Sequence, residues 1–205
     1  MIRYVFLGIV LGVVLAAVTR AAPTVLFGAT HSLVDSARAP TYGYANAPRA
    51  SVDFCRREPG QCRRDRRPRA GERVWLGAAL WQQLQTVNRE VNREIEPITD
   101  LELYGRAEYW TIPTTKGDCE DVALLKRKRL LGLGWSAGVV LIAIGRDHLD
   151  EGHAVLMIMA MQGDFVLDSK RDEVILWHLS GYNFVGRQSR HDPRLWVALE
   201  MEGRS

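Results

Sequence analysis

The second half of the chain contains several apolar segments that are too short for helices and are separated by turn residues. The segments 137–144 (AGVVLIAI), 152–161 (GHAVLMIMAM) and 165–168 (FVLD) predict strands. Residues 162–164 (QGD) predict a turn that joins the last two into a hairpin. A further strand is expected near 174–177, and 195–199 (LWVAL) is expected to pair as an edge strand. These segments predict an antiparallel sheet.

Two helices are expected before these strands. Apolar residues recur at steps of three and four over 74–95, which predicts a helix that ends before Pro97. A second helix is expected to begin near Asp118 and to stop at the glycines that follow residue 131. Helices first and strands later predict an α+β domain, and 205 residues suit one domain with a real core.

The N-terminus predicts export. Arg3 precedes an uninterrupted apolar run over 4–18, and small residues follow near Ala21. This order is typical of a secretory signal peptide over 1–21. The run is shorter than the roughly 20 apolar residues of a spanning helix, although an uncleaved anchor to the inner membrane through 4–18 is the alternative. In either case the remainder is expected to be periplasmic or exported.

A basic segment separates the N-terminus from the expected domain. Eight arginines fall within 56–73, while the whole chain has a formal charge of only +3. This charge is too small to indicate nucleic-acid binding. We interpret 22–72 as a loop-rich, solvated lead-in, with a basic arm for an anionic partner as the alternative. The folded domain is then expected to span 73–205.

The cysteine count separates one thiol from the other two. Cys55 and Cys62 lie close together in the loop FCRREPGQC, and they could form a local disulfide in an oxidising compartment. Cys119 is the odd cysteine, which is typical of a free reactive thiol.

Cys119 lies at the expected start of the second helix, in the sequence GDCED. A helix N-terminus lowers the pKa of a thiol, and its backbone N–H groups can hold the oxyanion that forms when a carbonyl is attacked. The adjacent carboxylates oppose thiol ionisation, so a nearby imidazolium would be needed. The alternative is a small, buried helix residue without chemistry.

His153 and Asp168 are the candidate base and orienting group. His153 begins one apolar strand and Asp168 ends the next. The alternatives are a histidine bonded to the backbone and an aspartate that caps a turn. A tight turn at 162–163 would pair Met157 with Asp168, which leaves His153 roughly 13 Å along the strand. For the two to meet, the pairing must be centred nearer Ala160 or contain a bulge.

Five sequence blocks resemble one known family. They are VNREVNREI (87–95), ITDLELYGRAEYW (98–110), KGDCEDVALLKRKRLLGLG (116–134), GHAVLMIMAMQGDFVLDS (152–169) and GYNFVGRQS (181–189). They are similar to the bacterial transglutaminase-like cysteine peptidases, a group that includes periplasmic proteases releasing biofilm adhesins. The resemblance implies a papain/transglutaminase-like fold and a catalytic triad of Cys119, His153 and Asp168.

The resemblance also implies a metal site. By position it implies calcium ligands at Asp118, Glu120 and Asp121, with a simple helix-start charge cluster as the alternative. Trp110 corresponds to a transition-state-stabilising residue in related transglutaminases, although packing is the favoured interpretation.

The expected function is an exported thiol protease that cleaves a cell-envelope protein, and a membrane-bound regulator is a further partner that we consider. The alternatives are a transglutaminase-type acyl transferase or deamidase, and a non-catalytic, calcium-responsive binding module.

Overall fold

The computed structural model describes residues 37–65 and 72–200. The expected signal peptide or anchor over 1–21 lies outside the described residues. Within the described residues, none of the helices combines the length and the apolar character that a membrane span requires.

A seven-stranded sheet forms the centre of the molecule, with strand order β1-β9-β8-β4-β5-β6-β7. Every neighbouring pair in it is antiparallel, as the sequence predicted. The strands are β1 (Tyr44–Ala45), β4 (Val140–Arg146), β5 (Gly152–Ala160), β6 (Gly163–Asp168), β7 (Arg171–Leu176), β8 (Asn183–Gln188) and β9 (Trp196–Ala198). In the middle, β5 is buried at every position after its first residue, which explains its continuous apolar sequence.

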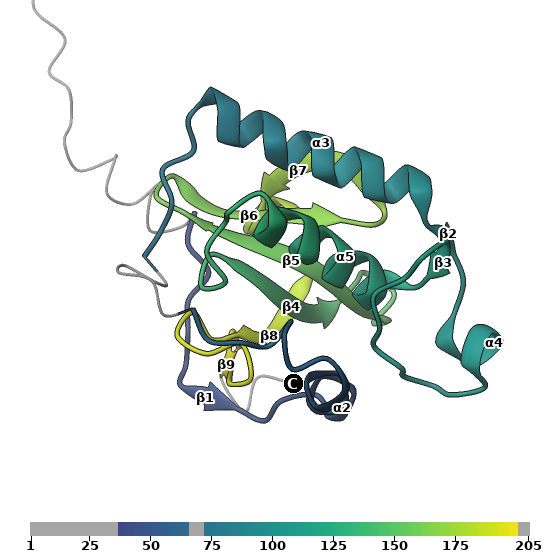
Figure 1. The fold of residues 1–205 in the computed structure, drawn as a ribbon. Coiled ribbons are helices and arrows are strands. Elements are labelled where there is room, and N and C mark those ends of the chain that lie inside the picture. The colour runs from purple at the N-terminus through teal and green to yellow at the C-terminus, as the bar shows by residue number, and fades with distance from the viewer. Residues whose placement is uncertain (1–36, 66–71, 201–205) are drawn as a thin grey trace, which may run out of the picture.

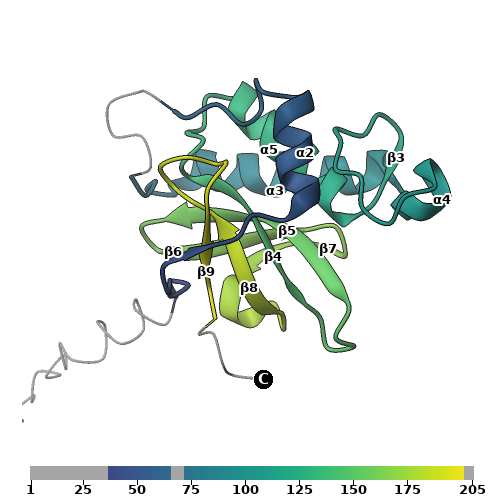
Figure 2. The same ribbon diagram turned by 90° about the horizontal axis from the view of Figure 1, so that it is seen from below.

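Helices α3 (Ala78–Glu94) and α5 (Cys119–Gly132) cover one face of this sheet (Figures 1 and 2). Helix α3 begins four residues later than the predicted start at 74, because Val74 instead forms an isolated bridge with Ala160 of β5. The predicted apolar face of α3 is confirmed by its buried residues Leu84, Val87 and Val91. Helix α5 packs on β5 and β4, and its first residue therefore lies near the start of β5.

Part of the predicted loop-rich lead-in is built into this domain. Residues Arg49–Arg57 form helix α2, whose Phe54 is 2% exposed. The two-residue strand β1 pairs with β9, so β9 is not the edge strand that the sequence suggested. The expected start of the folded domain near Arg73 is therefore too late, because a few buried side chains suffice to attach this polar segment.

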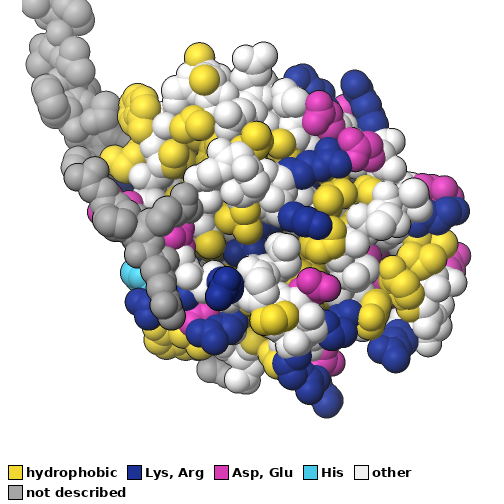
Figure 3. Space-filling model, in the orientation of Figure 1, with side chains coloured by type: hydrophobic (Ala, Val, Ile, Leu, Met, Phe, Trp, Pro, Cys, Tyr) yellow, Lys and Arg dark blue, Asp and Glu magenta, His cyan; other side chains and the backbone are white. Residues whose placement is uncertain are grey.

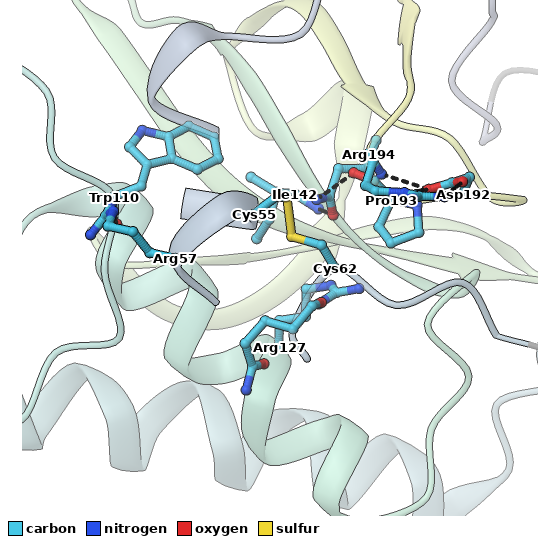
Figure 4. Close-up of a disulfide and its surroundings, with 11 residues drawn as sticks. Cys55, Arg57, Cys62, Trp110, Arg127, Ile142, Asp192, Pro193 and Arg194 are labelled. Atoms are coloured by element: carbon cyan, nitrogen blue, oxygen red, sulfur yellow. Dashed lines mark hydrogen bonds and ion pairs between the residues drawn. A yellow bond between two sulfur atoms is a disulfide. The ribbon is translucent and has the colours of Figure 1, made fainter. Parts of the chain in front are cut away.

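A disulfide between Cys55 and Cys62 closes the loop that follows α2 (Figure 4). The buried Arg127 of α5 donates from Nη1 to the carbonyl oxygen of Gln61 at 2.7 Å and from Nε to that of Val140 at 3.0 Å. On the other side, Arg57 Nη2 donates to the carbonyl oxygen of Trp110 at 2.8 Å. These contacts fix α2 and the loop after it beside α5 and the segment that contains Trp110.

The segment between α3 and α5 projects from the body of the molecule (Figure 1). The short parallel pair β2 (Glu96–Pro97) and β3 (Lys116–Gly117) closes its base. Helix α4 (Asp100–Tyr104) lies within it and begins with a capping box between Thr99 and Glu102. Between α3 and α5, α4 is the only helix.

Charged side chains of both signs are interspersed on the face shown in Figure 3.

Candidate functional site

Cys119 is the first residue of α5 and the only cysteine outside the disulfide. The N–H group of Ala154 donates to Cys119 Sγ at 3.4 Å, and the thiol donates to Glu120 Oε2 at 3.2 Å. Ala154 follows His153 on β5, so this contact joins the start of the helix to the start of the strand. Burial raises the pKa of the Cys119 thiol, and the Glu120 carboxylate raises it further. The helix N-terminus alone therefore does not ionise this thiol.

His153 and Asp168 form a buried hydrogen-bonded pair on neighbouring strands. The distance from His153 Nε2 to Asp168 Oδ1 is 2.8 Å, and the two side chains are 3% and 0% exposed. Because a carboxylate accepts, the neutral imidazole carries its proton on Nε2 in this pair, and Nδ1 is its acceptor atom.

The hairpin register explains how these two residues meet. Ala160 pairs with Gly163 and Leu156 with Leu167, so the turn consists of Met161 and Gln162. Continuing this register by one residue places Val155 opposite Asp168. His153 is then the diagonal neighbour on the same face, within reach of a long side chain. The tight turn at 162–163, which would have paired Met157 with Asp168, does not form, because Met157 pairs with Val166. The pairing is instead centred nearer Ala160, which is the condition under which the two residues were expected to meet.

Asp168 accepts hydrogen bonds on both of its oxygen atoms. Besides His153, the N–H group of Lys170 donates to Oδ1 at 3.0 Å, and the Tyr182 hydroxyl donates to Oδ2 at 2.6 Å. Burial raises the pKa of Asp168, but the hydrogen bonds from His153, Lys170 and Tyr182 outweigh it and lower the pKa to about 2. Asp168 is therefore a stable anion beside the imidazole. The sequence analysis missed Tyr182, although it lies in the matched block 181–189.

A cluster of acids lies on the other side of the cysteine. Oxygen atoms of Asp100, Asp118 and Glu120 come within 4.8 Å of one another. Asp100 Oδ1 and Asp118 Oδ1 are buried without a hydrogen-bond partner among the described residues. Burial and the hydrogen-bonded Asp118 carboxylate raise the pKa of Glu120 to about 9. Buried oxygen ligands without donors fit a hard cation such as calcium.

The structure changes the expected ligand set. Asp121 lies outside this cluster. Its Oδ1 accepts from the N–H group of Thr111 at 2.7 Å, and its Oδ2 is buried without a hydrogen-bond partner among the described residues. Asp100, from α4, joins Asp118 and Glu120 instead. The sequence offered no local signal for Asp100, which lies 18 residues before Asp118.

Trp110 is almost fully buried, although it lines one of the clefts that contain Cys119 and His153. It is 3% exposed, and its Nε1 donates to Glu108 Oε2 at 3.2 Å. Its ring lies 6.2 Å from that of Trp196. Packing is thus the interpretation that this geometry favours.

Two clefts flank the cysteine and the histidine, and both residues line each of them. One, of about 540 Å³, is bounded by the start of α2 (Pro48 to Ala50) and by Glu108. The other, of about 390 Å³, is bounded by the apolar Ile95 and Ile98. An extended peptide could therefore run across the thiol from one cleft to the other.

Comparison with known proteins identifies a family that matches this architecture. The model of the family described as bacterial transglutaminase-like cysteine proteinase matches residues 41–204. Among solved structures, Legionella pneumophila LapG in a calcium-bound form is 25% identical, with a TM-score of 0.50, over 60% of this chain and 72% of that chain. LapG in an EGTA-treated form is 25% identical, with a TM-score of 0.49, over 57% and 66%. No curated protein sequence matches this chain.

Proposed function

Because this chain belongs to the bacterial transglutaminase-like cysteine proteinase family, we propose that it cleaves a cell-envelope protein through a triad of Cys119, His153 and Asp168. It is a cysteine peptidase, and its matched region covers the helix and both strands that carry the three residues. The hydrogen bond from His153 to Asp168, beside a thiol at a helix start, is the observation that carries the proposal.

The tautomer of His153 defines the proton path. Since Nε2 donates to Asp168, Nδ1 takes the proton of the Cys119 thiol. The sulfur then attacks the peptide carbonyl, and the imidazolium returns the proton to the leaving amine. Water hydrolyses the acyl-enzyme, with His153 again acting as the base. Asp168 stabilises the imidazolium throughout, as a carboxylate with a low pKa can do.

The start of α5 supplies the remaining electrostatic stabilisation. The first N–H groups of a helix have no carbonyl partner within it, and they point toward the region where the oxyanion forms. Calcium bound by Asp100, Asp118 and Glu120 would supply positive charge next to Cys119 and so favour the thiolate. The similarity to LapG in its calcium-bound form supports calcium as the ion of this cluster.

The N-terminal sequence supports export as part of this proposal. A signal peptide over 1–21, or an anchor through 4–18, places the peptidase in the periplasm, where the Cys55–Cys62 disulfide is stable. Terminal sequencing of the exported protein distinguishes a cleaved peptide from a retained anchor.

Envelope proteomics tests the proposed activity. Cells that express the wild type are expected to release or shorten at least one envelope protein that stays intact with Cys119→Ala and with His153→Ala. The exposed His148 provides the matched control, and His148→Ala is expected to cleave like the wild type. Cleavage that persists in Cys119→Ala would contradict the proposal. Incorporation of a labelled amine into the same protein would instead indicate acyl transfer.

A further inference from the structure

The carboxylate of Asp168 is held from a loop that follows the triad in the sequence. This loop comprises the 3-10 turn η1 (Trp177–Leu179), Ser180, Gly181 and Tyr182. Gly181 has a φ of 82°, which reverses the chain at that point and suits glycine. Ser180 is 5% exposed, and its hydroxyl donates to the carbonyl oxygen of Trp177 at 2.6 Å. The loop is therefore a defined turn that ends at Tyr182.

Tyr182 contacts both members of the His153–Asp168 pair. Its hydroxyl lies 2.6 Å from Asp168 Oδ2, and its ring centroid lies 4.9 Å from that of His153. The far side of the Tyr182 ring packs at right angles to Phe184, at 6.0 Å. One side chain thus fixes the second carboxylate oxygen and forms a wall beside the imidazole.

We propose that Tyr182 is a positioning residue of the peptidase, one that holds the Asp168 carboxylate in the plane in which Oδ1 accepts from His153 Nε2. The inference rests on the proposed function of the triad. Without the hydroxyl, Oδ2 would keep only the Arg171 guanidinium at 3.4 Å, and the carboxylate could rotate about its Cβ–Cγ bond. Burial and the Asp168 carboxylate both raise the pKa of Tyr182, so its hydroxyl stays protonated and donates across the working pH range.

The backbone of the β6–β7 hairpin, at the turn between Asp168 and Arg171, is held independently of Tyr182. Asn92 of α3 donates from Nδ2 to the carbonyl oxygens of Asp168 at 3.1 Å and Arg171 at 2.9 Å. Asn88 donates to the carbonyl oxygen of Arg171 at 2.9 Å. Removal of the Tyr182 hydroxyl is therefore expected to free the carboxylate without releasing the hairpin.

Tyr182→Phe tests this role, because it removes the hydroxyl and keeps the ring. We expect kcat for the envelope substrate to fall about tenfold, the loss typical of one hydrogen bond to a charged group, with KM unchanged. Tyr182→Leu, which also removes the ring, is expected to lower kcat further. Tyr44 is 75% exposed, and Tyr44→Phe serves as the matched control with wild-type kcat.

A second measurement needs no substrate. In protein labelled with ¹⁵N-histidine, the Nε2–H proton of His153 is expected to exchange with solvent faster in Tyr182→Phe than in the wild type. If both kcat and the exchange rate stay at the wild-type value, the proposal is overturned. A lower melting temperature together with changes in both kcat and KM would mean a purely structural role for Tyr182 and would also overturn the proposal. If the wild type cleaves nothing, the proposed function fails, while the exchange rate still decides whether Tyr182 orders the pair.

Discussion

Two groups of carboxylates lie on either side of Cys119, and they differ in how their oxygen atoms are satisfied. Asp168 is 0% exposed, yet three hydrogen-bond donors lower its pKa to about 2. Glu120 is 5% exposed and lies beside Asp118, and its pKa is raised to about 9. Similar burial therefore gives opposite results, because hydrogen-bond donors surround Asp168 whereas Glu120 faces another carboxylate.

The comparison indicates that one site is complete and the other needs an added charge. Protein donors alone make Asp168 a permanent anion. The Asp100–Asp118–Glu120 cluster has buried oxygen atoms without donors, so it can release its protons readily only when a cation replaces them. Each prediction below alters one of these two groups.

Removal of the Asp168 carboxylate is expected to have the largest effect on activity. Asp168→Ala leaves His153 without its acceptor, and kcat is expected to fall by roughly 10³-fold or more, as for other catalytic triads. Added calcium is not expected to restore it. Peptide hydrolysis with and without calcium measures this, and Glu173→Ala, an exposed change on β7, is the control. A loss below tenfold would show that Asp168 does not support the base.

Calcium binding at the Asp100–Asp118–Glu120 cluster is expected to stabilise the fold. Calcium that binds only the folded protein, at 100 times its Kd, would add about 2.7 kcal/mol to the free energy of unfolding. Urea titration of the protein with calcium and with excess EGTA measures the difference. Equal stability in both conditions would mean that this cluster does not bind calcium.

Acid is expected to weaken the complete site. The pKa of Asp168 is about 2 in the folded state and about 3.9 in an unfolded chain. A depressed folded pKa contributes stability above the unfolded value, here about 2.5 kcal/mol, and this is lost as the pH falls from about 4 to about 2. Urea titrations of the wild type and Asp168→Asn at pH 5.5 and pH 2.5 are expected to show a gap that shrinks in acid. A gap that does not change with pH would contradict the low pKa.

The smallest expected effect separates the two candidate ligand sets. Asp100→Asn is expected to weaken calcium affinity roughly tenfold, since it removes one charged ligand. Asp121→Asn is expected to change affinity less than about twofold, because Asp121 lies outside the cluster of oxygen atoms. Calorimetric titration compares the two variants. If Asp121→Asn weakens calcium affinity more than Asp100→Asn, the ligand set expected from the sequence, which includes Asp121, is the correct one.

Local sequence patterns predicted most of the framework and part of the site. The periodicity of 74–95 and the apolar runs 137–144 and 152–161 identified α3, β4 and β5 because burial of one face imposes those patterns. Strand β8 was missed, since polar residues interrupt NFVGRQ. Helix α2 was missed because only Ser51 and Phe54 of its nine residues are buried.

Contacts between distant segments account for what sequence could not predict. Asp100 and Tyr182 reach the site through loops whose course depends on the whole fold. The register of β5 and β6 depends on which two residues form the turn, and apolar alternation does not determine this.

That turn, Met161-Gln162, sets the register of β5 and β6 and so the spacing of His153 and Asp168, although it lies at the other end of the hairpin. With the turn kept at two residues, adding or deleting one residue there would shift the pairing and carry Asp168 to the opposite face of the sheet from His153, because side chains alternate along a strand. A change of two residues would keep the face but move the carboxylate by about 7 Å along the strand. The spacing of His153 and Asp168 is therefore set by the position of a turn that contains neither residue.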